Sequence, residues 1–170
     1  MAVEKSAENA QDLPAALKLL AESFPDEVRE TRVVHGDALA VISAGALRKV
    51  MEFLKGDTRL QYDVLVDITA VDYLGQEPRF EVVYHLLSLA HHHRLRIKVG
   101  VCAETPTVES IAALWGNANW LEREVWDMFG IAFEGHPDLR RILLYPEFQG
   151  HPLRKDYPIH RRQPLIGPKN

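Results

Sequence analysis

The chain has 170 residues, of which 46% are apolar and 26% charged, and its formal net charge is −4 at pH 7. This composition is typical of one soluble globular domain with an ordinary hydrophobic core. No apolar run approaches the roughly 18 residues that a membrane-spanning helix needs. The start of the sequence lacks the basic and apolar regions of a signal peptide, so we expect a protein that is cytoplasmic or faces the cytoplasm. Cys102 is the only cysteine, which argues against an iron–sulfur cluster or a common structural zinc site in this chain alone.

The first third of the chain predicts a helix followed by a β-hairpin. Residues 12–24 place apolar side chains at helical spacing, and Asp12 is positioned to cap the first turn. Residues 30–43 contain two apolar, β-branched runs on either side of a Gly-Asp turn signal at Gly36. This pattern indicates two short strands joined by a tight turn.

A second helix is predicted over residues 44–55, after a cap at Ser43. Its apolar residues fall on one face, and we expect Gly56 to end it in the left-handed conformation.

Three strands are predicted next. Residues 62–69 alternate, which predicts an inner face made of Tyr62, Val64, Val66 and Ile68. Residues 79–89 are apolar on both faces, as in an interior strand, and residues 94–101 alternate again. The three consecutive histidines at 91–93 are interpreted as a solvated loop rather than a metal site, because consecutive side chains point in different directions.

Two further helices are predicted before the last third of the chain. One spans residues 104–116, and the other runs from Asn119 to Gly130, with Asn119 and Glu122 forming a capping box. Glu124 and Asp127 share a face of this helix. The acids of this helix could serve acid–base catalysis, a solvated or ion-paired face, or contact with a partner's basic groups. We favour the last two, because no Glu-x-x-His sequence accompanies them.

These elements predict an α+β fold: a two-layer αββαβββα domain with a mixed or antiparallel sheet over residues 1–130. Residues 131–170, here called the strap, form a long irregular C-terminal docking segment that contains six of the ten prolines. The strap has too much apolar surface to remain in water, so it must lie on its own domain or on another protein.

The strap contains the phrase Gly-His-Pro twice, at 135–137 and 150–152, and a basic pair follows each copy. A residue before proline prefers an extended backbone, so each copy is expected to be a turn followed by a conformationally restricted, extended segment that positions the basic pair. Residues 140–170 carry a net charge of +5, which leaves −9 on residues 1–139. This asymmetry predicts an acidic partner surface. Nucleic acid is disfavoured, because the arginines alternate with prolines and aliphatic residues and lack the stacking aromatics on strands that single-strand binders use.

Residues 121–158 contain the phrases EREVWDMFGI, GHPDLRRIL and GHPLRKDYP. In their order and spacing these phrases resemble the signature of the C-type, 30 kDa subunit family of proton-pumping NADH-quinone oxidoreductase, respiratory complex I. Phe148 stands where that family commonly has tryptophan. The resemblance implies that the signature and partner-interface residues are Glu122, Arg123, Glu124, Asp127, Phe129, Gly130, Gly135, His136, Pro137, Asp138, Arg140, Arg141, Gly150, His151, Pro152, Leu153, Arg154, Lys155, Asp156 and Tyr157.

The resemblance also implies a role: a non-catalytic structural subunit of the peripheral arm, which supports electron transfer from NADH to quinone. It implies that this chain has no catalytic, cofactor-binding or metal-binding residues, and that FMN and iron–sulfur clusters are held by partner subunits. The implied partners are chiefly the B-type and D-type subunits, on the cytoplasmic side of the bacterial inner membrane. The subunit would be peripheral and would meet the membrane only through the complex.

Two alternatives remain open. One is an equivalent subunit of a related membrane-bound hydrogenase or another complex I-like enzyme. The other is a stand-alone metalloenzyme that uses His136, His151, His160, Asp138 and Asp156, although their spacing matches no zinc signature.

Overall fold

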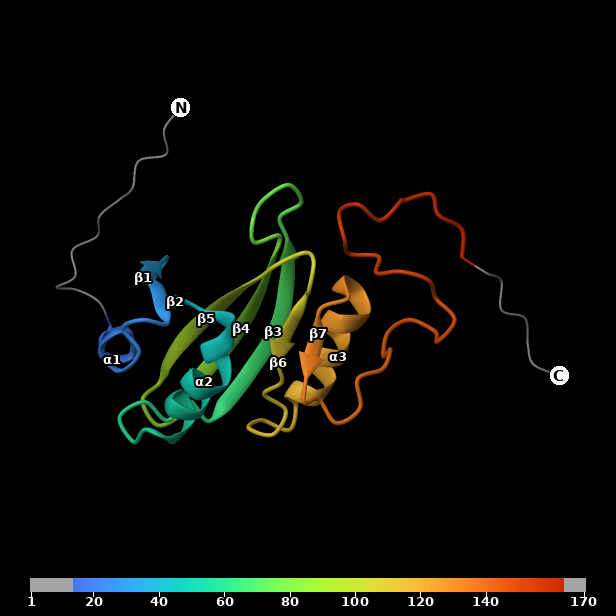
Figure 1. Cartoon of the computed structure of the whole chain (residues 1–170). Helices are drawn as coiled ribbons and strands as arrows, with labels where there is room; N and C mark the ends of the chain where they lie inside the picture. The colour runs from blue at the N-terminus through green and yellow to red at the C-terminus, as the bar shows by residue number, and fades with distance from the viewer. Residues whose placement is uncertain (1–13, 164–170) are drawn as a thin grey trace, which may run out of the picture.

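The computed structural model describes residues 14–163. A five-stranded mixed sheet runs in the order β1-β2-β5-β4-β3, and in the described chain only its β2–β5 pair is parallel (Figure 1). The strands are β1 (Val28–Val34), β2 (Asp37–Ile42), β3 (Val64–Asp72), β4 (Phe80–Ser88) and β5 (His93–Val101). The predicted α+β fold class with a mixed sheet is confirmed.

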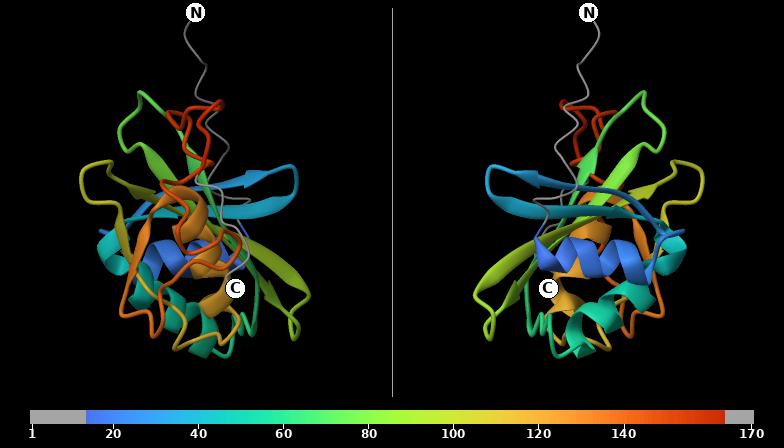
Figure 2. Two further views of the ribbon diagram at one scale, coloured as in Figure 1. Left: turned by 90° about the vertical axis from the view of Figure 1, so that its right-hand side faces the viewer. Right: turned by 90° about the vertical axis from the view of Figure 1, so that its left-hand side faces the viewer.

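The helices pack on one face of this sheet (Figure 2). They are α1 (Ala15–Ser23), α2 (Leu47–Gly56), which follows the 3-10 turn η1 (Ala44–Ala46), and α3 (Ala118–Phe129). Helix α2 buries Leu47, Val50, Met51 and Leu54, as its apolar spacing predicts. These side chains meet the inward residues of β4 and β5 in one continuous core, where each fully buried aliphatic side chain contributes roughly 1.5–3 kcal/mol.

The predicted first helix and hairpin are confirmed. His35 and Gly36 both have positive φ, 53° and 90°, which matches the turn type that suits the twist of two antiparallel strands. The predicted cap at Asp12 lies outside the described residues.

The second helical segment begins after Ser43 and ends at Gly56 as predicted, but the predicted capping bond and left-handed glycine are wrong. Gly56 is the last residue of α2 and has no positive φ, and the C-cap is Asp57, whose N–H donates to the Phe53 carbonyl. The Asp57 carboxylate then accepts the Arg59 N–H and turns the chain, so no left-handed glycine is needed. Ser43 makes no side-chain capping bond.

The predicted inner face of β3 is wrong at Val66, whose side chain is 45% exposed. A bulge between Leu65 and Asp67 shifts the register against β4 and breaks the alternation. Leu65 and Ile68 therefore both face the core, because the extra residue of a bulge reverses the side on which later residues point.

The predicted helix over residues 104–116 is also wrong. Residues of this segment form the short strand β6 (Thr107–Glu109), which pairs in parallel with β7 (Ala132–Glu134) at the start of the strap. Two β-branched residues follow Pro106, and this favours an extended backbone over a helix. The strap thus begins with a strand. Beyond β7, its described part consists of turns and irregular backbone without further helices or strands.

Candidate functional site

The strap runs beside α3 in the same direction as the helix. Near the first turn of α3, His136 Nε2 lies 3.1 Å from the Asn119 carbonyl oxygen. In its last turn, His151 Nδ1 lies 3.0 Å from the Asp127 carbonyl oxygen. The two Gly-His-Pro copies therefore attach at opposite ends of one helix, and the segment between them follows the helix surface.

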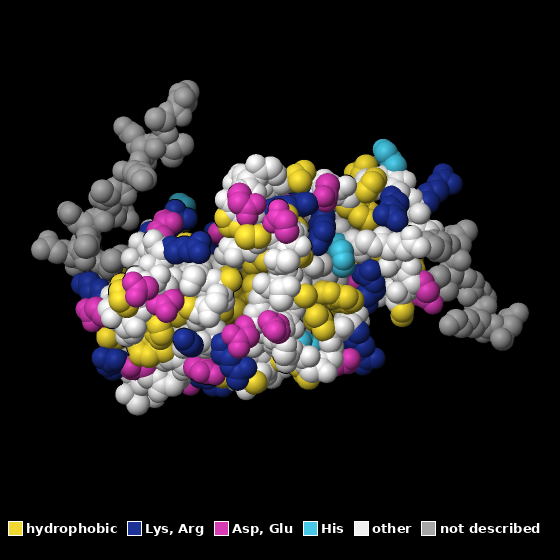
Figure 3. All heavy atoms as spheres, in the orientation of Figure 1, with side chains coloured by type: hydrophobic (Ala, Val, Ile, Leu, Met, Phe, Trp, Pro, Cys, Tyr) yellow, Lys and Arg dark blue, Asp and Glu magenta, His cyan; other side chains and the backbone are white. Residues whose placement is uncertain are grey.

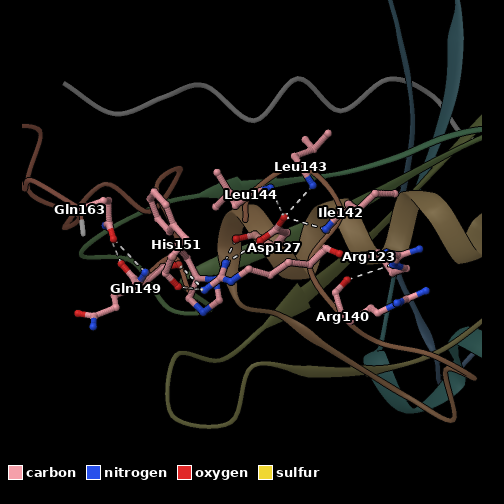
Figure 4. Close-up of polar contacts among 12 residues, drawn as sticks. Arg123, Asp127, Arg140, Ile142, Leu143, Leu144, Gln149, His151 and Gln163 are labelled. Carbon is pink, nitrogen blue, oxygen red and sulfur yellow. Dashed lines mark hydrogen bonds and ion pairs between the residues drawn. The ribbon is translucent and has the colours of Figure 1, made fainter. Parts of the chain in front are cut away.

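Asp127 is the centre of this attachment (Figure 4). Its side chain is fully buried, and Oδ1 accepts Arg141 Nη1 at 2.6 Å. Oδ2 accepts the backbone N–H groups of Ile142, Leu143 and Leu144 at 3.0, 2.9 and 2.9 Å. Burial alone would raise the pKa of Asp127, but these hydrogen bonds hold that pKa below its usual value. One carboxylate thus fixes a turn of the strap to the helix.

Arg141 extends the same attachment into the second half of the strap. Its Nη2 donates to the Phe148 and Gly150 carbonyls at 2.8 and 3.1 Å. Its guanidinium also lies over the rings of Trp126 and Phe148, 5.7 and 5.6 Å from their centres. A planar guanidinium with several fixed donors suits this role better than a lysine ammonium would.

The second Gly-His-Pro copy caps the C-terminus of α3. The last carbonyls of a helix have no partner within the helix, and here His151 donates to Asp127, and the Leu153 N–H to Met128 at 3.1 Å. Arg154 donates to the carbonyls of Phe129 and Gly130. A cation at this position also complements the negative end of the helix dipole.

Gly130 is required for this close approach. It ends α3, as predicted from the sequence, and its φ of 71° lies in the left-handed region. A Cβ placed there would lie 2.5 Å from His151 Cδ2 and 2.7 Å from Arg154 Nη2. Glycine therefore serves both the backbone conformation and the contact with the strap.

Glu122 is the second fully buried carboxylate of α3. It accepts the Ser110 hydroxyl at 2.6 Å and the Ile111 N–H at 2.7 Å, and no lysine or arginine of the described chain pairs with it. Burial is the dominant influence and raises the pKa of Glu122 to about 7, although both hydrogen bonds oppose the shift. Glu122 therefore tends to hold a proton near neutral pH.

His136 lies against Glu122 and is also buried, with Nε2 3.9 Å from the nearer Glu122 oxygen. The imidazole accepts the Asp138 N–H at Nδ1, at 3.0 Å, so its proton sits on Nε2 and is donated to the Asn119 carbonyl. This arrangement describes a neutral histidine used for attachment.

A second anchor joins the strap to the sheet. Arg79 donates from Nε and Nη2 to the buried Asp72 at 2.9 and 2.8 Å, and it also pairs with Asp156 of the strap at 2.8 Å. The Lys155 N–H donates to Asp72 at 2.8 Å. The hydrogen bond from Arg79 is the largest cause of the lowered pKa of Asp72. This network attaches the far part of the strap to the ends of β3 and β4.

The structure corrects our interpretation of the α3 acids. Glu122 and Asp127 are buried and bonded within the chain, and only Glu124 is exposed, so the three do not form one solvated face. The predicted capping box of Asn119 and Glu122 is also absent. The helix begins at Ala118, so Asn119 lies inside it, and Glu122 bonds to the Ile111 N–H instead. Asn117, at the cap position, donates its side chain to the Leu65 carbonyl.

The predicted basic pairs have divided roles. Arg141 and Arg154 bond to acceptors of their own chain and are not free for a partner's acids. Arg140 is exposed and pairs with Asp138 at 2.8 Å, and the Lys155 side chain is exposed.

The other signature residues also lie along the contact between the strap and α3, here called the junction. Phe129 is buried and Leu153 is 54% exposed. The Tyr157 ring stacks on that of Phe148, with 6.2 Å between ring centres. Gly135 and Gly150 have positive φ of 79° and 96°, and Pro137 and Pro152 follow in the two turns.

Several residues of the site were not predicted from the sequence. Ser110, Asp72 and Arg79 hold Glu122 or the strap, yet none belongs to a recognisable phrase. One signal was present: Asp72 and Arg79 flank the turn between two predicted strands, where opposite charges are brought side by side.

The part of the chain that is described contains no metal-binding cluster. Between residues 14 and 163, no three His, Cys, Asp or Glu side chains gather closely enough to hold a metal ion. Two grooves, of about 450 and 180 Å³, are lined by neither Glu122, His136 nor Asp127. No helix among the described residues is long and apolar enough to cross a membrane.

The sequence matches the protein family described as respiratory-chain NADH dehydrogenase, 30 Kd subunit, over residues 40–163. The C-type subunit of NADH-quinone oxidoreductase from Roseiflexus castenholzii is 47% identical over 88% of this chain and 86% of its own length. The protein of the same name from Geobacter sulfurreducens is 44% identical over 93% of this chain and 98% of its own length.

Two solved structures share the fold. A trypsin-resistant fragment of Nqo5 is 34% identical, with a TM-score of 0.64 over 72% of this chain and 98% of the fragment. A chain of an archaeal respiratory membrane complex, the membrane-bound sulfane sulfur reductase, is 26% identical, with a TM-score of 0.72 over 85% of this chain and 84% of its own.

Proposed function

The chain belongs to the family of 30 kDa subunits of respiratory-chain NADH dehydrogenase, and we propose that it is a non-catalytic structural subunit of the peripheral arm of a proton-translocating NADH-quinone oxidoreductase. In this role it supports electron transfer from NADH to quinone without binding either. FMN and the iron–sulfur clusters are held by partner subunits. The complex places the chain on the cytoplasmic side of the bacterial inner membrane, without direct contact with lipid.

The observation that carries the proposal is that the side chains that could take part in catalysis are bonded within the chain. The buried carboxylates of α3, the histidines of the two Gly-His-Pro copies, Arg141 and Arg154 all bond to groups of their own chain. Catalytic groups need a site where substrate can approach the reacting atom, whereas these groups fix the strap to α3. Their arrangement supports a structural role.

The outer side of the strap is suited to contact with a neighbouring subunit. Leu143, Leu153 and Ile159 are 61%, 54% and 90% exposed, and Arg140, Lys155, Arg161 and Arg162 are exposed among them. Figure 3 shows basic and apolar side chains side by side on this end of the molecule. Apolar anchors with arginine and lysine around them fit an acidic protein surface. The B-type and D-type subunits are the partners we propose.

A second candidate is the equivalent subunit of another complex I-like enzyme, such as a membrane-bound hydrogenase. The fold similarity to a chain of the membrane-bound sulfane sulfur reductase favours it. The higher identity to proteins named as C-type subunits of NADH-quinone oxidoreductase favours the first candidate.

Purification of the tagged full-length chain from its own cells tests the proposal. We expect mass spectrometry to identify B-type and D-type subunits in near-equal amounts, together with NADH–quinone oxidoreductase activity. Ile159→Glu should reduce this copurification, and Leu89→Glu, at a 56% exposed residue of the β4–β5 turn, is the matched control. Copurification of hydrogenase or sulfur reductase subunits would favour the second candidate, and recovery of the chain alone would contradict both.

The absence of cofactors in this chain has its own test. The isolated full-length chain, purified without a histidine tag, should contain far less than one iron, zinc or flavin per chain by elemental analysis and absorbance. One equivalent of any of these would contradict the proposed non-catalytic role.

A further inference from the structure

We propose that Trp120 and Arg123 of α3 form a docking site for a carboxylate on an acidic surface of a neighbouring protein subunit. This inference rests on the proposed function and deepens it, because it locates one contact on the helix rather than on the basic pairs of the strap.

Arg123 is a buried cation without a counter-ion in the described chain. The residue is only 7% exposed. Its Nε donates to the Arg140 carbonyl at 3.1 Å and its Nη2 to the Arg141 carbonyl at 2.9 Å. No carboxylate among residues 14–163 lies within ion-pair distance of its guanidinium. Carbonyl groups satisfy its hydrogen bonds but do not neutralise its charge, so a nearby anion would be stabilising.

The other well-buried guanidiniums differ from Arg123. Arg141 pairs with Asp127, and Arg79 pairs with Asp72 and Asp156. Arg154 has carbonyl partners, but it lies at the C-terminal end of α3, where the helix dipole supplies negative charge. Arg123 lies in the middle of the helix, away from either end. Its position therefore calls for a negative group from outside the chain.

Trp120 covers this cation from the solvent side. Trp120 is 60% exposed, which is unusual for so large an apolar residue. Its ring centre lies 5.2 Å from Arg123 Cζ. Residues three apart in a helix share a face, and the contact with a fixed guanidinium holds the ring in place. Tryptophan and arginine dominate the energetics of protein interfaces, so an exposed tryptophan held over a buried arginine fits a docking site.

Charge complementarity indicates the occupant. Arg123 adds an uncompensated positive charge, and Arg140, whose backbone carbonyl holds Arg123, has a 71% exposed side chain beside it. The chain from residue 140 onward carries a net charge of +5. An aspartate or glutamate of a partner, flanked by apolar atoms that cover the indole, matches this surface.

Copurification from the native cells tests the site, with tagged Trp120→Ala compared with tagged wild type. We expect the apparent affinity for the partner subunits to fall roughly 30-fold, as for a removed interface anchor. Trp120→Phe should recover part of it, while the thermal midpoint of the isolated chain stays unchanged. Leu89→Ala, which shortens another exposed apolar side chain, is the control.

The proposed function and the docking site fail in different ways. If wild type recovers no complex I-type subunits, the proposed function fails. If wild type recovers them and Trp120→Ala recovers as much as Leu89→Ala does, only the docking site is wrong.

The chemical class of the occupant is tested by a photo-crosslinking benzoylphenylalanine in place of Trp120, within the intact complex. A crosslink to a segment of another subunit that contains aspartate or glutamate supports the proposal. A crosslink to a second copy of this chain, to a segment without acids, or to no protein at all overturns it.

Discussion

Glu122 and Asp127 lie five residues apart on α3 and are both fully buried, but the protein stabilises opposite forms of the two carboxyl groups. Asp127 accepts an arginine and three backbone N–H groups, which favour the anion. Glu122 has one hydroxyl and one N–H donor, and burial favours its protonated form. The Asp127 carboxylate attaches the strap to α3, whereas the Glu122 carboxyl group makes the stability of the fold depend on pH.

Glu122→Gln should stabilise the chain at high pH. Burial raises the pKa of Glu122 from 4.5 to about 7, so the folded state binds the proton more tightly than the unfolded state. The contribution of Glu122 to stability is therefore fully present below pH 4.5, and it is lost as the pH rises to about 7. Glutamine mimics the protonated form, and we expect it to gain about 3 kcal/mol over wild type at pH 8 and little near pH 4.5.

Urea unfolding of wild type and Glu122→Gln at several pH values measures this difference. Glu124→Gln, at the exposed acid of the same helix, should leave the pH profile unchanged. A Glu122→Gln protein that is less stable than wild type at pH 8 would show that Glu122 is ionised and needed as an anion.

Asp127→Asn should destabilise the junction at neutral pH. The pKa of Asp127 is lowered in the folded state, so its contribution is present above the unfolded pKa and is lost as the pH falls through the folded pKa. Removal of the charge leaves Arg141 mostly buried and unpaired, which costs about 3 kcal/mol. The expected sign at pH 7 is opposite to that of Glu122→Gln.

Limited trypsin digestion provides the readout for Asp127→Asn, because loss of attachment exposes Arg141 and frees the backbone around Arg140 and Arg141 to enter the protease. We expect faster cleavage there than in wild type, and no change in Asp138→Asn, whose carboxylate is 55% exposed. Equal cleavage of wild type and Asp127→Asn would mean that the carboxylate does not hold the strap.

Gly130→Ala should detach the second Gly-His-Pro copy. Alanine in the left-handed conformation costs roughly 1–2 kcal/mol, and its Cβ would also overlap His151 and Arg154. Gly135→Ala is a matched control, because its φ is also positive, at 79°, but a Cβ there meets nothing. Thermal unfolding should show a larger loss for Gly130→Ala, and similar losses would contradict the close contact.

Arg141→Lys should weaken the strap although it keeps the charge. Lysine can reach Asp127, but a single ammonium cannot also serve the Phe148 and Gly150 carbonyls as the guanidinium does. We expect a loss of about 1–2 kcal/mol in denaturant unfolding. Arg140→Lys, at an exposed position, should leave the free energy of unfolding unchanged. If Arg141→Lys also leaves it unchanged, the guanidinium is not needed to bind Asp127, Phe148 and Gly150 together.

The sequence was sufficient for elements whose signals are local. The hairpin turn at Gly36, the apolar face of α2 and the end of α3 at Gly130 depend on residues close in the chain, and all three were predicted correctly. The predicted helix at 104–116 failed although the β-branched pair after Pro106 favours an extended backbone, because the strand that pairs with β6, β7, lies more than twenty residues later. No local pattern contains that partner.

The candidate site was predicted as a set of residues but not as an arrangement. The repeated Gly-His-Pro phrase indicated a stiff strap with basic groups, yet which acids they meet depends on how the strap lies on α3. Burial of Asp127 is possible only because Arg141 and three strap N–H groups replace its water. Read on the helix alone, Asp127 and Glu124 both looked solvated.

Hydrogen exchange at the backbone amides of Ile142, Leu143 and Leu144 in the isolated full-length chain tests the central claim most directly. The claim is that the strap folds onto its own α3, through Asp127, before any partner binds. We predict that these three amides are protected in wild type and exchange at least tenfold faster in Asp127→Asn. Exchange in wild type at the rate of an unfolded peptide would contradict the claim, and would mean that the strap is ordered only by a partner.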